Sequence, residues 1–227
     1  MVVYFVRHGH PNYKDDILTP LGRLQAEAAS QKLVTYGIEK VFSSTKGRAL
    51  ETASYTAEKL GLEIVPCDFI REINWTPSVE EPVLLNGHPW RLAEHFTREG
   101  IDLRLLDPKS DEPFCNTHLS ESIHTVRVGI DEWLAQLGFQ REGAYYRITK
   151  ATPHAVAIFS HGGAQAAAFS HILNIPFMQM CKLISFNFTS ITAVSFCGEV
   201  GELCYPNVIL STAEHINGIT VENEFGN

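Results

Sequence analysis

The chain of 227 residues has the length of a single globular domain that can bury a substantial core. Hydrophobic residues make up 44% of it and charged residues 19%, the composition of an ordinary soluble domain. Its formal net charge of −8 argues against non-specific binding to nucleic acid or to anionic membranes. An anionic small-molecule substrate stays compatible with this charge, because a local basic pocket can lie in an acidic surface.

The five cysteines are odd in number and include no Cys-x-x-Cys pair. This spacing argues against a disulfide framework or a zinc ribbon and indicates reduced thiols. The N-terminal residues lack the pattern of a signal peptide, and no apolar run reaches membrane-spanning length. We therefore expect a cytoplasmic protein with neither nucleic acid nor a membrane as partner.

The first third of the chain alternates between strand-like and helix-like segments. Residues 2–6 are continuously apolar and predict a strand covered on both faces. A helix follows, with Thr19 as N-cap, Pro20 at its first position and Gly37 as its stop. The next elements are a strand over 40–44, a helix from Arg48 to Gly61 and a strand over 62–67. This alternation predicts a parallel sheet with helical crossovers.

The middle of the chain, residues 74–150, is interrupted by prolines. Two of its segments, 88–100 and 120–138, have helical character. We expect a mainly helical insertion that covers the active site. No Gly/Ser-rich linker marks it as a separate domain.

The last third restores the alternating pattern. Residues 155–159 predict a buried strand, and a helix over 164–174 follows directly. Two further strands, 190–197 and 202–211, are predicted to form a hairpin at the far side of the sheet. The whole chain, residues 1–227, is thus predicted to be one three-layer α/β/α sandwich with a mostly parallel central sheet.

Polar residues gather where three of these predicted strands end. Arg7 and His8 follow the first strand, Arg48 opens the helix after the second, and His161 follows the strand over 155–159. In an open α/β sheet, ligands bind at the carboxyl ends of the strands. The sequence therefore predicts that two arginines, two histidines and two helix N-termini meet at one edge.

This set of groups suits a phosphoryl group. Arginine presents a fixed fork of donors that matches phosphate oxygens, and helix N-termini add unpaired backbone N–H groups. Gly9, Gly162 and Gly163 allow the backbone to approach an anion closely. A histidine among such donors can act as nucleophile through one ring nitrogen, while the other nitrogen donates to a backbone carbonyl and fixes the tautomer.

Several motifs together resemble the histidine phosphatase superfamily, the phosphoglycerate-mutase-like branch 1. Arg7-His8-Gly9 is similar to its signature, and LTPLGRLQA resembles its first helix. FSSTKGRALETA resembles its second arginine motif, IFSHGG its second histidine motif, and SESIHTVRVGI a recurrent segment of the insertion. STAEHI near the C-terminus is similar to its closing motif.

The resemblance implies roles for particular residues. His8 would be the nucleophile that becomes phosphohistidine, and Arg7, Arg48 and His161 would hold the phosphoryl oxygens. Arg71-Glu72-Ile73 resembles the usual loop that carries a catalytic acid. Glu72 would then protonate the leaving group and afterwards activate water. The family reaction needs no metal and no cofactor.

The chain also departs from the family pattern. The loop after Glu72 reads NWTPSVEEP, so Glu80 or Glu81 could share or replace the role of the acid. His10 stands where many relatives have glutamate or glutamine. The loop over 11–18 looks short, so the polar phosphate contact usually supplied there would come from Asn12 or Tyr13 or would be missing. The backbone of Gly162 is expected to contribute to substrate binding.

Four functions are compatible with these residues. A phosphomonoester hydrolase acting on a small phosphorylated metabolite is favoured, because acidic residues stand after Glu72 where a mutase would need basic ones. Arg91, Arg98 and Arg104 keep a phosphoglycerate-mutase-type phosphotransferase open. A metal-dependent hydrolase would use His8 and His10 as ligands but would leave the arginines without a role. A non-catalytic phosphate-binding module would not need His8. Association into a homodimer is possible for any of them.

Overall fold

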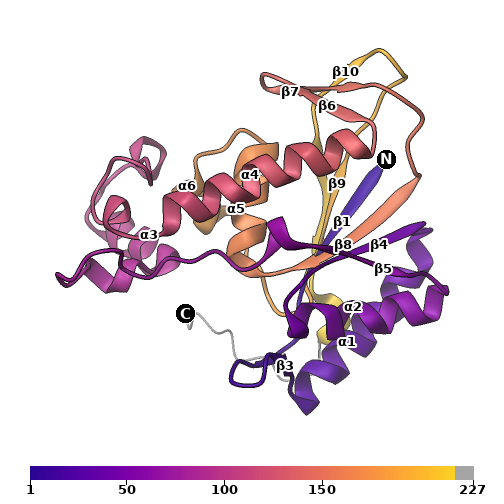
Figure 1. The fold of residues 1–227 in the computed structure, drawn as a ribbon, viewed down its shortest axis with the longest axis horizontal. Helices are drawn as coiled ribbons and strands as arrows, with labels where there is room; N and C mark the ends of the chain where they lie inside the picture. Colours follow the sequence, from indigo (N-terminus) through magenta and orange to yellow (C-terminus); the bar gives the residue numbers. More distant parts are fainter. Residues whose placement is uncertain (218–227) are drawn as a thin grey trace.

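A six-stranded sheet forms the centre of the structure, a computed structural model that describes residues 1–217 (Figure 1). The strands lie in the order β11-β9-β1-β8-β4-β5. Their bounds are Asn207–Thr212, Ile191–Ser195, Val2–Arg7, Ala155–Ser160, Lys40–Ser44 and Ile64–Cys67. β1, β8, β4 and β5 run parallel, and β9 runs antiparallel to both of its neighbours. The predicted mostly parallel sheet is confirmed.

Helices cover both faces of this sheet. α1 (Pro20–Leu33) and α2 (Gly47–Leu60) pack on one face, and α4 (Leu119–Gln136) and α5 (Gly162–Ile172) pack on the other (Figure 1). The alternation of side chains along a strand explains why both faces need cover. Val3 and Phe5 of β1 enter the core under α4 and α5, whereas Val6 enters the core under α1 and α2. The three-layer α/β/α architecture predicted from the sequence is confirmed.

Local sequence signals set the ends of the first two helices. The side chain of Thr19 accepts a hydrogen bond from the Gly22 N–H at 3.1 Å, as an N-cap does. α1 continues as a short 3₁₀ turn, Val34–Tyr36, and stops at Gly37, whose φ of 64° is left-handed. α2 ends at Gly61 in the same conformation, with φ of 65°. These predicted helix ends are confirmed.

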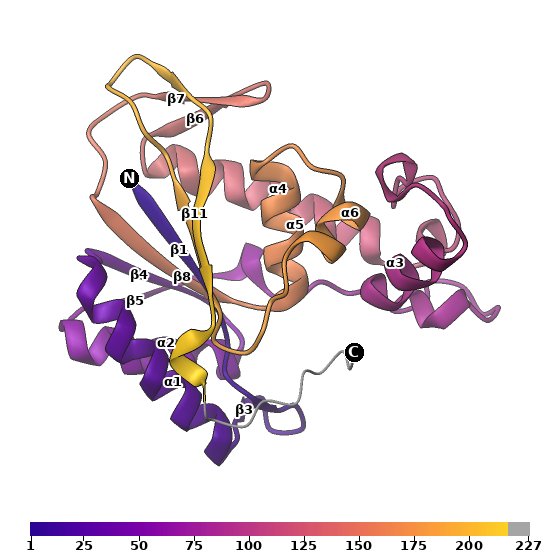
Figure 2. The ribbon, with the colours of Figure 1, turned by 180° about the vertical axis from the view of Figure 1, so that it is seen from behind.

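The middle segment is not wholly helical. α3 (Pro89–Arg98) and α4 confirm the two predicted helices, and α3 projects to one side of the sheet (Figure 2). Between α4 and β8, however, the chain forms an antiparallel hairpin of β6 (Phe139–Glu142) and β7 (Tyr145–Ile148). Trp133 of α4 packs edge-on against Phe42 of β4, with ring centroids 5.2 Å apart, and so joins this segment to the sheet. No helix among residues 1–217 is both long and apolar enough to cross a bilayer.

The predicted strand pair at the far side of the sheet lies at its edge. β9 pairs with β11, which is the edge strand (Figure 2). The connection between them carries β10 (Leu203–Cys204), which pairs with β7 instead. α6 (Phe177–Leu183), which the sequence analysis did not predict, precedes this pair. Two very short strands, β2 (Pro11–Asn12) and β3 (Ile17–Leu18), close the loop after β1.

Candidate active site

His8 lies directly after β1 and is almost completely buried, with an exposed fraction of 1%. Its Nδ1 is 2.7 Å from the carbonyl oxygen of Gly9. A carbonyl only accepts, so Nδ1 carries the proton and Nε2 keeps its lone pair. The Nε–H of Arg48 donates to that Nε2 at 3.3 Å, which agrees with this tautomer. The ring is therefore fixed with its unprotonated nitrogen toward the guanidinium of Arg48.

Arg7 is the residue before His8, and β1 ends with it. Its guanidinium donates to the carbonyl of Phe186, and its Cζ lies 4.2 Å above the ring of Phe188. Both partners belong to the segment before β9, almost 180 residues further along the chain. These contacts hold the buried Arg7 side chain against the segment before β9.

His161 follows β8, which lies between β1 and β4 in the sheet. Its ring centroid is 5.1 Å from that of His8, and its Nε2 is 2.8 Å from the hydroxyl of Ser44 at the end of β4. Nδ1 is buried and has no hydrogen-bond partner within residues 1–217. One ring nitrogen of His161 is thus held by Ser44, and the other is a buried nitrogen whose hydrogen-bonding capacity is unused within the described residues.

Both histidines are held in the neutral form. Burial is the main cause that lowers the pKa of His8 well below its usual value, and the nearby Arg7 adds to it. Burial also lowers the pKa of His161, and the neighbouring His8 reinforces this shift. A neutral imidazole is the form in which Nε2 of His8 can act as a nucleophile.

Glu72 lies in the loop after β5 and reaches the beginning of α5. Its Oε1 accepts hydrogen bonds from the N–H groups of Ile73 at 3.0 Å and Ala164 at 3.1 Å. Burial raises the pKa of Glu72, although Arg7 and these N–H groups act in the opposite direction. A raised pKa favours the protonated carboxyl that a general acid requires. Glu80 and Glu81, in contrast, are exposed on the surface of the insertion.

Gly163 makes the contact between Glu72 and α5 possible. A Cβ at this position would lie 2.6 Å from Oε1 of Glu72 and 2.5 Å from Cγ1 of Ile73. We expect Gly163→Ala to displace the Glu72 loop, to lower the free energy of unfolding by about 1–3 kcal/mol and to reduce turnover. Denaturant unfolding of the variant measures the change in the free energy of unfolding.

Gly162→Ala is the matched control for this stability measurement. A Cβ at Gly162 would have Arg7 Nε as its nearest neighbour at 3.6 Å, which is an ordinary contact. Its effect on stability should be clearly smaller than that of Gly163→Ala. Equal losses in the two variants would show that the contact with Glu72 is not the cause.

Asp16 is a member of the site that the sequence analysis missed. Its carboxylate forms an ion pair with Arg48 and also accepts a hydrogen bond from the Gly47 N–H, the first of α2, at 2.9 Å. The Asp16 backbone has a left-handed φ of 53°. Asp16 therefore holds Arg48 through Nη1, whereas Nε of the same guanidinium faces His8. The residues around a loop aspartate do not indicate that its partner is an arginine on a helix further along the chain.

The ionisation of Asp16 leads to a pH-dependent prediction. Burial alone would raise its pKa, but the hydrogen bonds from Gly47 and Arg48 outweigh burial and lower the pKa. Because the folded-state pKa is lowered, the stabilisation is present above the unfolded-state pKa of about 4 and is lost as the pH falls through the folded-state pKa.

Asp16→Asn should therefore cost about 1 kcal/mol of unfolding free energy at pH 7, and the difference from wild type should shrink below about pH 4. Denaturant unfolding at several pH values tests this, with Asp15→Asn as the control. A difference that is independent of pH would contradict the assigned ion pair.

The two residues proposed for an additional phosphate contact behave differently. The side chain of Asn12 is bonded within its own turn, to Asp15 at 2.8 Å and to the Lys14 N–H at 3.1 Å. The ring of Tyr13 lies 5.4 Å from Cζ of Arg48. A phosphate contact from either residue stays a prediction, and Tyr13 is the one whose ring lies near Arg48.

The donors expected for a metal site do not converge. His10, the second histidine of the predicted pair, bonds through Nδ1 to Thr19 Oγ1 at 3.0 Å, whereas Nε2 of His8 faces Arg48. Within residues 1–217, no group of three or more histidine, cysteine, aspartate or glutamate side chains is arranged to hold a metal ion. The charged groups that the structure places next to His8 are the guanidinium groups of Arg48 and Arg7.

Residues 3–208 match the histidine phosphatase superfamily (branch 1), and the chain belongs to this family. Among curated relatives, a probable phosphoglycerate mutase GpmB of Yersinia pestis (strain Pestoides F) is 32% identical over 90 residues. That match covers 36% of this chain and 42% of the relative, so less than half of the relative is represented.

Solved structures of phosphatases share the fold. Phosphoserine phosphatase from Entamoeba histolytica, solved in complex with 3-phosphoglyceric acid, is 19% identical with a TM-score of 0.59, over 95% of this chain and 98% of that one. Mycobacterial glucosyl-3-phosphoglycerate phosphatase is 21% identical with a TM-score of 0.61, over 91% and 96% of the two chains. At these identities the similarity establishes the fold.

Proposed function

We propose that this protein hydrolyses phosphate monoesters of small metabolites through a phosphohistidine intermediate on His8. The observation that carries the proposal is the orientation of the His8 ring. Its Nδ1–H is bonded to the Gly9 carbonyl, so Nε2 presents its lone pair next to the guanidinium of Arg48. A nucleophile fixed beside a cation suits attack on an anionic phosphoryl group.

In the first step, Nε2 of His8 attacks phosphorus as the bond from phosphorus to the leaving oxygen breaks. Glu72, whose raised pKa favours the protonated form, gives its proton to that oxygen. Arg7, Arg48 and His161 hold the other phosphoryl oxygens, and the N–H groups at the start of α5 add positive potential. In the second step, Glu72 takes a proton from water, whose oxygen attacks phosphorus while the bond to His8 breaks.

A mutase of the phosphoglycerate type is the second candidate, because curated relatives bear that name. Such an enzyme needs cations that hold a second phosphate near the site. Two of the three arginines considered for this role form local ion pairs on the surface: Arg98 with Glu94 at 3.1 Å and Arg104 with Asp102 at 2.6 Å. This pairing favours hydrolysis over transfer.

The partition of the phosphoenzyme between water and an acceptor tests the proposal. The protein is mixed with phosphoserine, 3-phosphoglycerate and p-nitrophenyl phosphate in turn, quenched in alkali and examined for phosphohistidine by ³¹P NMR. Release of inorganic phosphate in proportion to substrate consumed is the expected result. Transfer to added phosphoglycerate without release of phosphate would favour the mutase, and no phosphoenzyme with any substrate would contradict both.

A further inference from the structure

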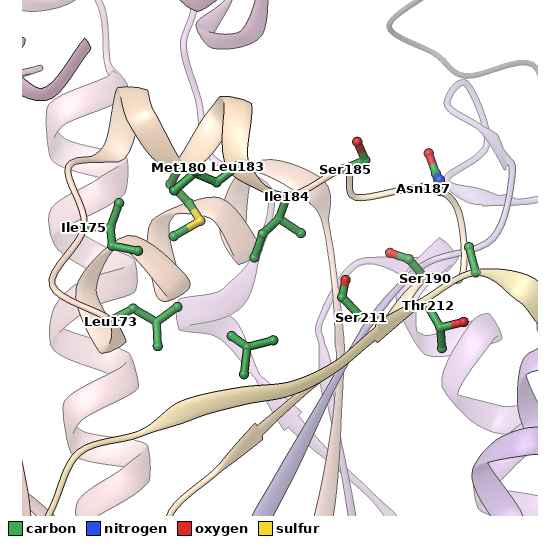
Figure 3. A pocket seen from close by; sticks show the side chains of 12 residues that line it. Leu173, Ile175, Met180, Leu183, Ile184, Ser185, Asn187, Ser190, Ser211 and Thr212 are labelled. Atoms are coloured by element: carbon green, nitrogen blue, oxygen red, sulfur yellow. The ribbon is translucent and has the colours of Figure 1, made fainter. Parts of the chain in front are cut away.

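A cavity of about 490 Å³ lies between α6, the segment 184–190 and β11 (Figure 3). None of the residues assigned above to phosphoryl transfer lines it. The volume is in the range of small-molecule sites, which is roughly 300–1,000 Å³. We call it the Ser190 cavity after the residue discussed below.

The side chains around the Ser190 cavity are separated by polarity. Apolar side chains gather at one end (Figure 3): Leu173, Ile175, Met180, Leu183 and Ile184. Uncharged polar side chains gather at the other: Ser185, Asn187, Ser190, Ser211 and Thr212. Among the described residues that line the cavity, none carries a charge. This lining suits an uncharged molecule with an apolar body and excludes the phosphorylated substrates of the active site.

Ser190 provides an independent sign of a ligand. Its exposed fraction is 3%, and its hydroxyl has no hydrogen-bond partner within residues 1–217. A buried hydroxyl without a partner is costly for the folded state, so its presence calls for an explanation. Figure 3 shows this hydroxyl at the polar end of the cavity. A hydrogen-bonding group of a ligand would satisfy it.

The segment 184–190 separates the Ser190 cavity from the active site. Ile184, Ser185, Asn187 and Ser190 line the cavity. The residues between them serve the catalytic groups: Phe186 accepts from the Arg7 guanidinium, and the ring of Phe188 lies under it. The Ser190 carbonyl also accepts from the Arg7 N–H at 3.1 Å. One short segment therefore touches both sites.

We propose that the Ser190 cavity binds a small uncharged amphipathic molecule, whose polar group bonds to Ser190, and that its binding changes the affinity of the active site for phosphate through the segment 184–190. The binding step is independent of turnover. The coupling rests on the proposed phosphate site, so it is measured with inorganic phosphate and not with a reaction rate.

The methyl groups of methionine report binding directly. The chain has three methionines, and of these Met180 lines the cavity. Hexanamide, titrated into protein with ¹³C-labelled methionine methyl groups, should shift the Met180 signal saturably in the millimolar range, whereas hexanoate should not. Absence of a saturable shift with hexanamide, or an equal affinity for hexanoate, would overturn the proposal.

Two tryptophan variants on β11 form a matched pair. Both side chains are exposed, but Val208 lines the cavity and its neighbour Ile209 does not. Val208→Trp should fill the space and abolish the hexanamide shift, and Ile209→Trp should leave it intact. If Val208→Trp instead converted a dimer into monomers, the cavity would be part of an interface between two copies and the proposal would be wrong.

Ser190→Ala tests the polar contact. It should weaken hexanamide binding about fivefold, the effect of losing one ordinary hydrogen bond. It should not lower the melting temperature, because it removes a buried hydroxyl that has no partner. Unchanged hexanamide affinity in this variant would contradict the assigned head-group contact.

Titration calorimetry with inorganic phosphate, with and without saturating hexanamide, tests the coupling. The expected result is a severalfold change in phosphate affinity in wild type and in Ile209→Trp, but none in Val208→Trp. Unchanged phosphate affinity in wild type would overturn the coupling, and mutually exclusive binding would show that the cavity is an extension of the active site. If phosphate did not bind at all, the proposed function would fail while hexanamide binding was still measurable.

Discussion

His8→Ala is expected to reduce the hydrolysis of every phosphate monoester by more than about a thousandfold. The loss should be large because the substitution removes the atom that forms the covalent bond. The remaining arginines can still bind phosphate but cannot form a covalent bond to phosphorus. Alkaline quenching followed by ³¹P NMR should therefore detect phosphohistidine in wild type and none in the variant.

His10→Ala is the matched control for this substitution. His10 lies in the same segment, but its ring bonds to Thr19 and packs against Phe188 at a centroid distance of 5.3 Å. His10→Ala should still form phosphohistidine on His8 and should keep most of the activity. Circular dichroism and phosphate titration show whether His8→Ala has kept its fold and its binding site. Full activity in a folded His8→Ala protein would eliminate the covalent mechanism.

The second large effect is expected for Glu72→Gln. General acid–base catalysis contributes about 10²- to 10⁴-fold, so hydrolysis of an alkyl phosphate such as phosphoserine should fall by that range. The phosphorylation step should fall much less with p-nitrophenyl phosphate, whose leaving group needs little protonation. Rapid-quench measurement of phosphoenzyme formation with both substrates separates this step from hydrolysis of phosphohistidine.

The pH dependence of phosphoenzyme formation follows from the direction in which the pKa of Glu72 is shifted. Because burial raises the pKa of Glu72, its proton is retained to higher pH than in an ordinary glutamate. Phosphoenzyme formation from phosphoserine should decline as the pH rises through that raised pKa, and this alkaline decline should be absent in Glu72→Gln. The exposed Glu80 and Glu81 supply controls, and a comparable loss in Glu80→Gln or Glu81→Gln would move the role of the acid to them.

The sequence by itself determined the ends of the parallel strands and hence the place of the site. Arg7 lies at the end of a predicted strand, and His8, Arg48 and His161 each follow one. Parallel strands in one sheet end at one edge, so these side chains could be brought together before any coordinates were known. Thr19 and Gly61 fixed helix ends for a similarly local reason, since capping depends on the nearest few residues.

Short segments without a strong period were decided by tertiary structure. The hairpin over 139–148 and the helix over 177–183 were both missed. A segment of four to seven residues is too short for its apolar pattern to distinguish the helical period from the alternation of a strand. The hairpin gains a third strand from residues 203–204, about 55 residues further on. Such a partner cannot be inferred from a local pattern, but it decides whether the segment is extended.

The electrostatic environment of the site was also decided only in three dimensions. The ion pair of Asp16 with Arg48 joins residues 32 apart, and the contact of Arg7 with Phe186 joins residues 179 apart. The pKa shifts of His8 and Glu72 arise from burial, which is a property of packing and not of neighbours in sequence. The sequence thus determined which chemical groups meet, and the tertiary structure determined their protonation and orientation, because these depend on contacts between distant segments.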